Sequence, residues 1–174
     1  MNNLIFRLAQ FADIPQLVDL INKSYREQQG RSWTTELEFV KGQRITEFQL
    51  KEQLQCANST LLVVETEFSK IVACVGLTFE NSQVEIGTFC TDPQVQNMRV
   101  GRSVLEYAEQ YALKEVPHLT NAVMYVLDVR SELIAYYERR GYVKTDNEQP
   151  YPVEADVGVP MVPIKLIEIK KDLK

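Results

Sequence analysis

The sequence has little of what metal sites, disulfide scaffolds and histidine-based catalysis require. It contains three cysteines, none of them in a Cys-x-x-Cys pair, and one histidine, His118, which follows Pro117 in an expected loop. An odd number of widely spaced cysteines is not typical of a disulfide framework, and one histidine does not complete a Cys/His zinc site. We therefore expect no metal and no Ser-His-Asp or Cys-His mechanism.

The chain also lacks a basic excess and a long apolar run. Its 19 Lys and Arg against 24 Asp and Glu give a net charge of −5, which argues against a nucleic-acid partner. The longest apolar run, residues 71–77, is far shorter than the roughly 20 residues of a membrane-spanning helix, so no membrane partner is expected. Residues 1–13 show no secretory signal, and a cytoplasmic location is expected.

The composition is that of a globular protein with one hydrophobic core. The 174 residues are 45% hydrophobic and 25% charged, which predicts a single domain over residues 1–174. Three Val/Ile-rich segments, 61–66, 70–79 and 83–90, are separated by short polar breaks and indicate an antiparallel meander. Helical spacing elsewhere predicts an α+β fold, with a mixed sheet and helices on its faces.

The remaining segments complete this prediction. Further strands are expected at 5–8, 122–129, 142–144 and 162–170. Helices are expected after an Asp13 N-cap, from Val100 to about 114, and after a Ser131 N-cap, the last ending at Gly141 in the left-handed conformation. Residues 34–55 are expected to form a loop or one or two short helices, and residues 145–160 a loop.

The segment between the meander and the next helix has the features of an anion site. Asp92-Pro93 turns the chain, and the following residues lead into the helix, whose free N–H groups and dipole attract phosphate. Gly101 permits close approach of the backbone, and Arg99 and Arg102 add positive charge. The alternative is an ordinary strand–turn–helix connection that binds nothing, since one glycine near a helix start is not specific. The segment has neither a P-loop ending nor a Gly-x-Gly-x-x-Gly pattern, which argues against ATP and NAD.

Two motifs resemble those of the GNAT superfamily of N-acetyltransferases, and they occur along the chain in the same order as in that superfamily. Gln96, Arg99, Val100 and Gly101 occupy the frame of its acetyl-CoA signature, with Arg99 in place of the first glycine. The second motif is Ala-Tyr-Tyr-Glu-Arg-Arg-Gly-Tyr at residues 135–142, which resembles the family's helix ending in Tyr-Glu-x-x-Gly-Phe. The likeness covers nearly the whole chain and implies a central mixed, mostly antiparallel sheet of about six or seven strands with helices on both faces.

Three further segments resemble a bacterial subgroup with a Gly-Trp-Thr-Thr-Glu stretch. They are Gly-Arg-Ser-Trp-Thr-Thr-Glu at residues 30–36, Gly42-x-Arg44, and Pro-Tyr-Pro at residues 150–152. This subgroup resemblance fixes no acceptor.

The resemblance to the superfamily implies acetyl-CoA as co-substrate and a set of residues that bind it. The main chain of Phe89, Cys90 and Thr91 would pair with the pantetheine arm. The pyrophosphate would lie on the N–H groups of Gln96, Asn97, Met98, Arg99, Val100, Gly101, Arg102 and Ser103. Arg130 stands where many relatives have an asparagine that contacts the cofactor, and it either does the same or pairs with Glu132 or Asp128.

The resemblance also implies how the transfer proceeds. Tyr137 matches the family position of the general acid that protonates the departing thiolate, the alternative being a tyrosine that only packs in the core. Glu85 lies on the strand where several members carry an acidic base, the alternative being an exposed strand carboxylate. Cys90 in a buried strand is expected to be an inert hydrophobe, so direct attack by the amine is favoured over an acetyl-enzyme.

The acceptor is expected to be a small-molecule or peptide amine. Asp146, Glu148, Glu154 and Asp156 make the late loop acidic, which either attracts a cationic amine or is simply solvated. Flat apolar walls would come from three aromatic residues, Tyr25, Trp33 and Tyr151. The rival function is a non-catalytic acyl-CoA-binding sensor or interaction module that keeps the fold. Homodimers are common in such families, and nothing in this sequence demands one.

Overall fold

A seven-stranded sheet forms the centre of the computed structural model, which describes residues 4–27, 34–95 and 100–174. Its strand order is β1-β3-β4-β5-β6-β9-β7, and among these described strands β5–β6 is the only parallel pair. The bounds are β1 Ile5–Leu8, β3 Ser59–Glu65, β4 Ile71–Glu80, β5 Gln83–Thr91, β6 Asn121–Leu127, β7 Val143–Pro150 and β9 Lys165–Asp172. The predicted mixed, mostly antiparallel sheet and its meander, β3 to β5, are confirmed.

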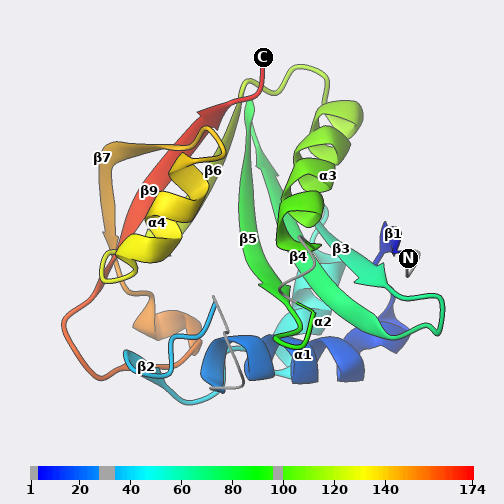
Figure 1. Cartoon of the computed structure of the whole chain (residues 1–174), viewed down its shortest axis with the longest axis horizontal. Helices are drawn as coiled ribbons and strands as arrows, with labels where there is room; N and C mark the ends of the chain where they lie inside the picture. Colours follow the sequence, from blue (N-terminus) through cyan, green and yellow to red (C-terminus); the bar gives the residue numbers. More distant parts are fainter. Residues whose placement is uncertain (1–3, 28–33, 96–99) are drawn as a thin grey trace.

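Helices cover both faces of this sheet, as predicted (Figure 1). They are α1 Ile14–Arg26, α2 Glu47–Gln55, α3 Val100–Glu115 and α4 Ser131–Glu138. Strand β3 is apolar on both sides because it is covered twice: Leu61 and Val63 belong to the core under α1 and α2, and Leu62 and Val64 to the core under α3. Strand alternation therefore feeds two hydrophobic cores, one on each face.

Strands β5 and β6 pair only at their beginning and then diverge (Figure 1). Their ladder consists of three residue pairs, Gln83–Asn121, Val84–Ala122 and Glu85–Val123. The divergence divides the sheet into a first wing, β1-β3-β4-β5, and a second wing, β6-β9-β7, which α4 accompanies.

A β-bulge bends β5 just after the divergence begins. Cys74 pairs with Cys90 and Gly76 with Gly87, so two residues of β5, Thr88 and Phe89, oppose a single residue of β4. Thr88 has a φ of 47°, a conformation that is strained for a β-branched residue. The bulge turns the second half of β5 relative to the first.

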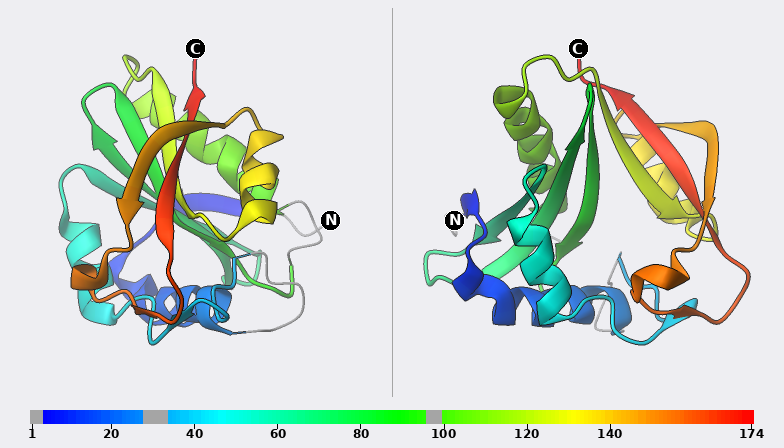
Figure 2. Two further views of the ribbon diagram at one scale, coloured as in Figure 1. Left: turned by 90° about the vertical axis from the view of Figure 1, so that its left-hand side faces the viewer. Right: turned by 180° about the vertical axis from the view of Figure 1, so that it is seen from behind.

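The open end between the wings is closed by short elements from two distant parts of the chain (Figure 2). Strand β2, Val40–Lys41, pairs with β8, Val159–Pro160, and the 3-10 helix η3, Val153–Ala155, precedes β8. Helix α2, with a capping box at Thr46, confirms a short helix within residues 34–55, whereas β2 was not predicted.

Four expectations about the ends of elements are corrected by the structure. The expected loop at 145–160 is strand up to Pro150, and the last strand begins at Lys165 instead of 162. Strand β7 is polar, almost fully exposed and irregular between Lys144 and Glu148, so it lacks the apolar alternation that identifies a strand. The first error therefore arises at this exposed edge strand of the sheet.

The other two corrections concern helix caps. Asp13 occupies the N-cap position of α1, as predicted, but its carboxylate forms no capping hydrogen bond to that helix; it accepts instead from the Gln10 amide at 2.7 Å and from Arg7, and Asp13 also ends the 3-10 helix η1, Phe11–Asp13. Arg130, not Ser131, occupies the N-cap of α4. Gly141 has a φ of 92°, as predicted for the end of that helix. No helix in the described ranges is long and apolar enough to span a membrane.

Candidate active site

A cavity of about 460 Å³ lies between the diverging parts of β5 and β6. Residues 85–89 of β5, residues 124–127 of β6, and Leu133 and Tyr137 of α4 line it. Further lining residues come from α1, from residues 34–44, and from the end of β7 and the segment after it: Tyr25, Thr34, Glu36, Arg44, Gln149, Tyr151, Pro152 and Val157. This volume is typical of a small-molecule site.

The cavity brings together six of the residues singled out in the sequence. They are Tyr25, Glu85, Phe89, Arg130, Tyr137 and Tyr151. Six others lie at the end of β5 and the start of α3 and are not part of its lining: Cys90, Thr91, Val100, Gly101, Arg102 and Ser103. Five lie outside the described residues: Trp33, Gln96, Asn97, Met98 and Arg99.

Tyr137 lies in the last turn of α4 and is both a core residue and a cavity residue. Its side chain packs with Phe89 and Tyr142 at ring-centroid distances of 6.5 and 5.9 Å, and the residue is only 4% exposed. Burial raises its pKa well above the usual value for a phenol. The hydroxyl therefore remains protonated at neutral pH and is available as a donor.

Glu85 is the last residue of β5 that pairs with β6, so its side chain lies where the cavity begins. Glu85 is an exposed residue, yet partial burial of its carboxylate raises the pKa, and the negative charge of Glu80 raises it further. Glu80 lines the same cavity. The two acids make this end of the cavity negative.

Arg130 is 5% exposed and links α4 to the segment before β2. Its guanidinium donates to the Thr35 carbonyl and to the Glu132 carboxylate. Of the two pairings considered from the sequence, the one with Glu132 is present, while Asp128 accepts from the Lys165 amide instead. Arg130 still contributes to the cavity lining.

Two hydroxyl groups of helix α1 donate hydrogen bonds to the second half of β5. The Tyr25 hydroxyl donates to the Phe89 carbonyl at 3.0 Å, and the Ser24 hydroxyl to the Thr91 carbonyl at 3.3 Å. Cys90 points into the core under α1 and α2, with its Sγ 3.5 Å from that of Cys74. The Cys90 thiol is thus directed away from the cavity.

Gly101 allows three elements to meet at the start of α3. A Cβ there would lie 3.4 Å from the Tyr136 hydroxyl and close to the side chains of Phe89 and Thr91. Arg102, one residue on, is exposed and pairs with Glu106 at 2.7 Å. The absence of a side chain at Gly101 therefore brings α3, α4 and β5 close together.

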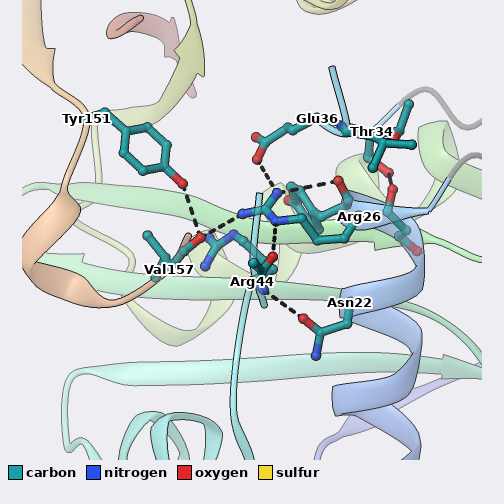
Figure 3. Close-up of polar contacts among 12 residues, drawn as sticks. Asn22, Arg26, Thr34, Glu36, Arg44, Tyr151 and Val157 are labelled. Carbon is teal, nitrogen blue, oxygen red and sulfur yellow. Dashed lines mark hydrogen bonds and ion pairs between the residues drawn. The ribbon is translucent and has the colours of Figure 1, made fainter. Parts of the chain in front are cut away.

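The floor of the cavity, which we define as Arg26 and the groups it binds, is organised by one guanidinium (Figure 3). Arg26 donates to the Gly42 carbonyl at 2.9 Å, to the Glu36 carboxylate at 2.7 Å and to the Val157 carbonyl at 2.6 Å. The Tyr151 hydroxyl also donates to Val157, at 3.1 Å. Arg26 thereby joins α1, β2 and the segment after β7.

Arg44 lies beside the floor and lines the cavity (Figure 3). Its amide donates to the Asn22 side-chain oxygen at 2.7 Å, and its guanidinium lies 5.2 Å from the centre of the Tyr25 ring. Sequence reasoning assigned it no role, although the Gly42-x-Arg44 pattern pointed to it. Glu36 ends the Gly-Trp-Thr-Thr-Glu-like segment but was likewise assigned no role, and Arg26 and Glu80 were missed without any motif to indicate them.

The acids of the late segment do not form the expected rim. Asp146, Glu148, Glu154 and Asp156 are not among the residues that line the cavity, and Glu148 pairs with Lys165 at 2.6 Å. The lining acids are Glu36, Glu80 and Glu85. Within the described ranges, no group of three or more His, Cys, Asp or Glu is placed to hold a metal ion.

Comparison with known proteins identifies the family. The model of the acetyltransferase (GNAT) family matches residues 14–142, and because this is more than half of the chain, the chain belongs to that family. No curated protein matches it by sequence.

Solved structures with the same fold cover nearly the whole chain. The ribosomal-protein-S18-alanine N-acetyltransferase from Escherichia coli is 13% identical over 99% of this chain and 95% of that chain, with a TM-score of 0.72. The PaiA N-acetyltransferase from Thermoplasma acidophilum, in complex with coenzyme A, is 14% identical over 98% and 99%, with a TM-score of 0.70. The spermidine/spermine N-acetyltransferase SpeG from Vibrio cholerae is 13% identical over 98% and 92%, with a TM-score of 0.68. At these identities the likeness is one of fold.

Proposed function

We propose that this chain transfers an acetyl group from acetyl-CoA to an amine acceptor by direct attack of the amine on the thioester. The observation that supports this most strongly is the cavity between β5 and β6, which has a buried, protonated Tyr137 in its wall and Glu85 at its edge. Family membership and the coenzyme A complex of the Thermoplasma acidophilum protein support the choice of co-substrate.

The part of β5 beyond its ladder with β6 suits the pantetheine arm of coenzyme A. The ladder ends at Glu85 within the described strands, and the Phe89 and Thr91 carbonyls beyond it already accept from the Tyr25 and Ser24 hydroxyls, which hold this part of the main chain in position. An extended amide chain binds a strand edge as an added strand would, and Phe89, Cys90 and Thr91 are the residues we assign to it. The N–H groups of the first α3 turn, from Val100 to Ser103, would hold pyrophosphate.

In the proposed reaction, the cavity residues handle two protons. Glu85, whose raised pKa makes it a better base than an ordinary carboxylate, accepts the proton that the attacking amine loses, directly or through water. The N–C bond forms as the C–S bond breaks. Tyr137 donates its hydroxyl proton to the departing thiolate and is reprotonated from solvent. Acetyl-CoA supplies the activated acetyl group.

The Tyr137→Phe variant tests this proposal. It keeps the ring that packs against Phe89 and removes only the donor, so we expect kcat to fall by about 10²- to 10⁴-fold while the KM for acetyl-CoA changes by less than about twofold. Release of coenzyme A with a panel of amines measures the first quantity, and thermal unfolding checks that the variant folds.

Two outcomes would contradict the proposal in different ways. Unchanged turnover in Tyr137→Phe would reduce Tyr137 to a packing residue. Calorimetric binding of acetyl-CoA without turnover of any amine would favour the acyl-CoA-binding sensor instead of the enzyme.

A further inference from the structure

The cavity contains a cation whose charge no carboxylate in the described chain neutralises. Arg44 lines the cavity, and its guanidinium forms no ion pair within those residues; it lies over the Tyr25 ring, 5.2 Å from the ring centre. The neighbouring Glu36 is unavailable because it pairs with Arg26 at 2.7 Å. Arg26, Glu36 and Arg44 together therefore leave one net positive charge at this end of the cavity.

Arg44 is held ready to bind a ligand. The Asn22 side chain accepts from the amides of Arg44 and Ile45, at 2.7 and 3.3 Å, and donates to the Ile45 carbonyl at 2.9 Å. The Tyr25 ring, itself tied to Phe89, supports the guanidinium through a cation–π contact. Because the backbone and the ring are already fixed, little conformational entropy is lost when an anion binds.

The opposite charge lies elsewhere in the same cavity. Glu80 and Glu85 line it where β5 and β6 begin to part, so one region of the cavity suits an ammonium group and the other an anion. A guanidinium binds a carboxylate through two parallel hydrogen bonds. One net positive charge balances a carboxylate, whereas a phosphate dianion would leave one negative charge without a partner.

We propose that the acceptor is an amine that also carries a carboxylate, an amino acid or a molecule that ends in one, with its carboxylate on Arg44 and its amine toward Glu85 and Tyr137. This inference rests on the proposed acetyltransferase function and names its acceptor class. It excludes a polyamine as the preferred acceptor, since a polyamine has no anionic group to meet Arg44.

The experiment compares each standard amino acid with the amine that remains when its carboxylate is removed, for example L-phenylalanine with phenethylamine. With the unaltered enzyme we expect kcat/KM to be about 10- to 100-fold higher for the carboxylate-bearing member of the preferred pair. Arg44→Gln should abolish that preference while leaving the amine itself within about threefold, and Arg44→Lys should retain part of it. Lys41→Gln, which removes an exposed cation of β2 outside the cavity, is the matched control.

A second measurement separates this inference from the proposed function. The N-acetylated form of the amino acid keeps the carboxylate, and its binding is measured by calorimetry in the presence of coenzyme A. Binding that Arg44→Gln weakens by about tenfold or more supports the inference even if turnover is absent. Equal turnover of an amino acid and its amine, or equal loss of both in Arg44→Gln, would overturn it while leaving the acetyltransferase proposal intact.

Discussion

The wall and the floor of the cavity are held in place by different kinds of interaction. The wall consists of β5, β6 and Tyr137, and sheet hydrogen bonds and apolar packing position it. The floor depends on one side chain, since Arg26 donates to Glu36, Gly42 and Val157, which are up to 131 positions away in sequence. A single substitution in the wall should change stability little because many hydrogen bonds and apolar contacts hold it. A substitution in the floor should change it more because the contacts there belong to few side chains.

The largest effect is expected from Arg26→Met. Removing one partner of this largely buried ion pair leaves Glu36 without Arg26 and takes one donor from each of the Gly42 and Val157 carbonyls, so the free energy of unfolding should fall by about 3 kcal/mol. Urea unfolding measures this. Lys165→Met, which breaks the exposed pair with Glu148, is the control and should cost less than about 1 kcal/mol. Equal losses in the two variants would show that the floor is not a special region.

Gly158→Ala should have the next largest effect. Gly158 has a φ of 116°, and a Cβ there would lie 2.6 Å from Val40 Cγ1 and 2.9 Å from the Arg26 guanidinium, so we expect a loss of about 2–3 kcal/mol in unfolding free energy.

Gly87→Ala, in the wall, provides the comparison for this change. Its Cβ would meet only the Glu85 carboxylate, at 3.9 Å, and should cost less than about 1 kcal/mol. A tolerated alanine at Gly158 would mean that β2 and β8 can move apart freely.

The smallest effect is expected in the wall, from Glu85→Gln. Glu85 acts as a base only when its carboxylate is deprotonated, so kcat/KM should rise as the pH increases through the raised pKa of Glu85. The Glu85→Gln variant should lose this rise. At neutral pH the loss should be about tenfold, the modest value reflecting a side chain that water can replace.

Glu80→Gln sharpens this test because it keeps the base. Glu80 raises the pKa of Glu85, so removing its charge should move the acidic limb to lower pH without lowering the plateau. A profile that stays in place in both variants would exclude Glu85 as the titrating group.

The wall was predictable from the sequence and the floor was not. Alternating and continuous apolar segments identified β3, β4, β5 and β6, and the resemblance to the family assigned Tyr137 and Glu85 to one site. The floor depends on contacts such as Arg26 to the Val157 carbonyl, which use backbone oxygens and so leave no trace in side-chain pattern.

Short and exposed elements escaped prediction for a related reason. Strands β2 and β8 have two residues each, too few for any periodicity, and β7 is an edge strand without an apolar face. Arg44 stood in a recognised pattern, but its role depends on the ring of Tyr25 beside it, which only the fold brings near.

The short ladder between β5 and β6 has a thermodynamic consequence. Within the described strands the β5–β6 ladder has three residue pairs, so a molecule bound in the cavity, where it would contact residues of both wings, adds to the contacts that join them. By mass action, such a ligand raises the free energy of unfolding by RT ln(1 + [L]/Kd), where [L] is the free ligand concentration. Substrate occupancy and resistance to unfolding are therefore thermodynamically linked in this molecule.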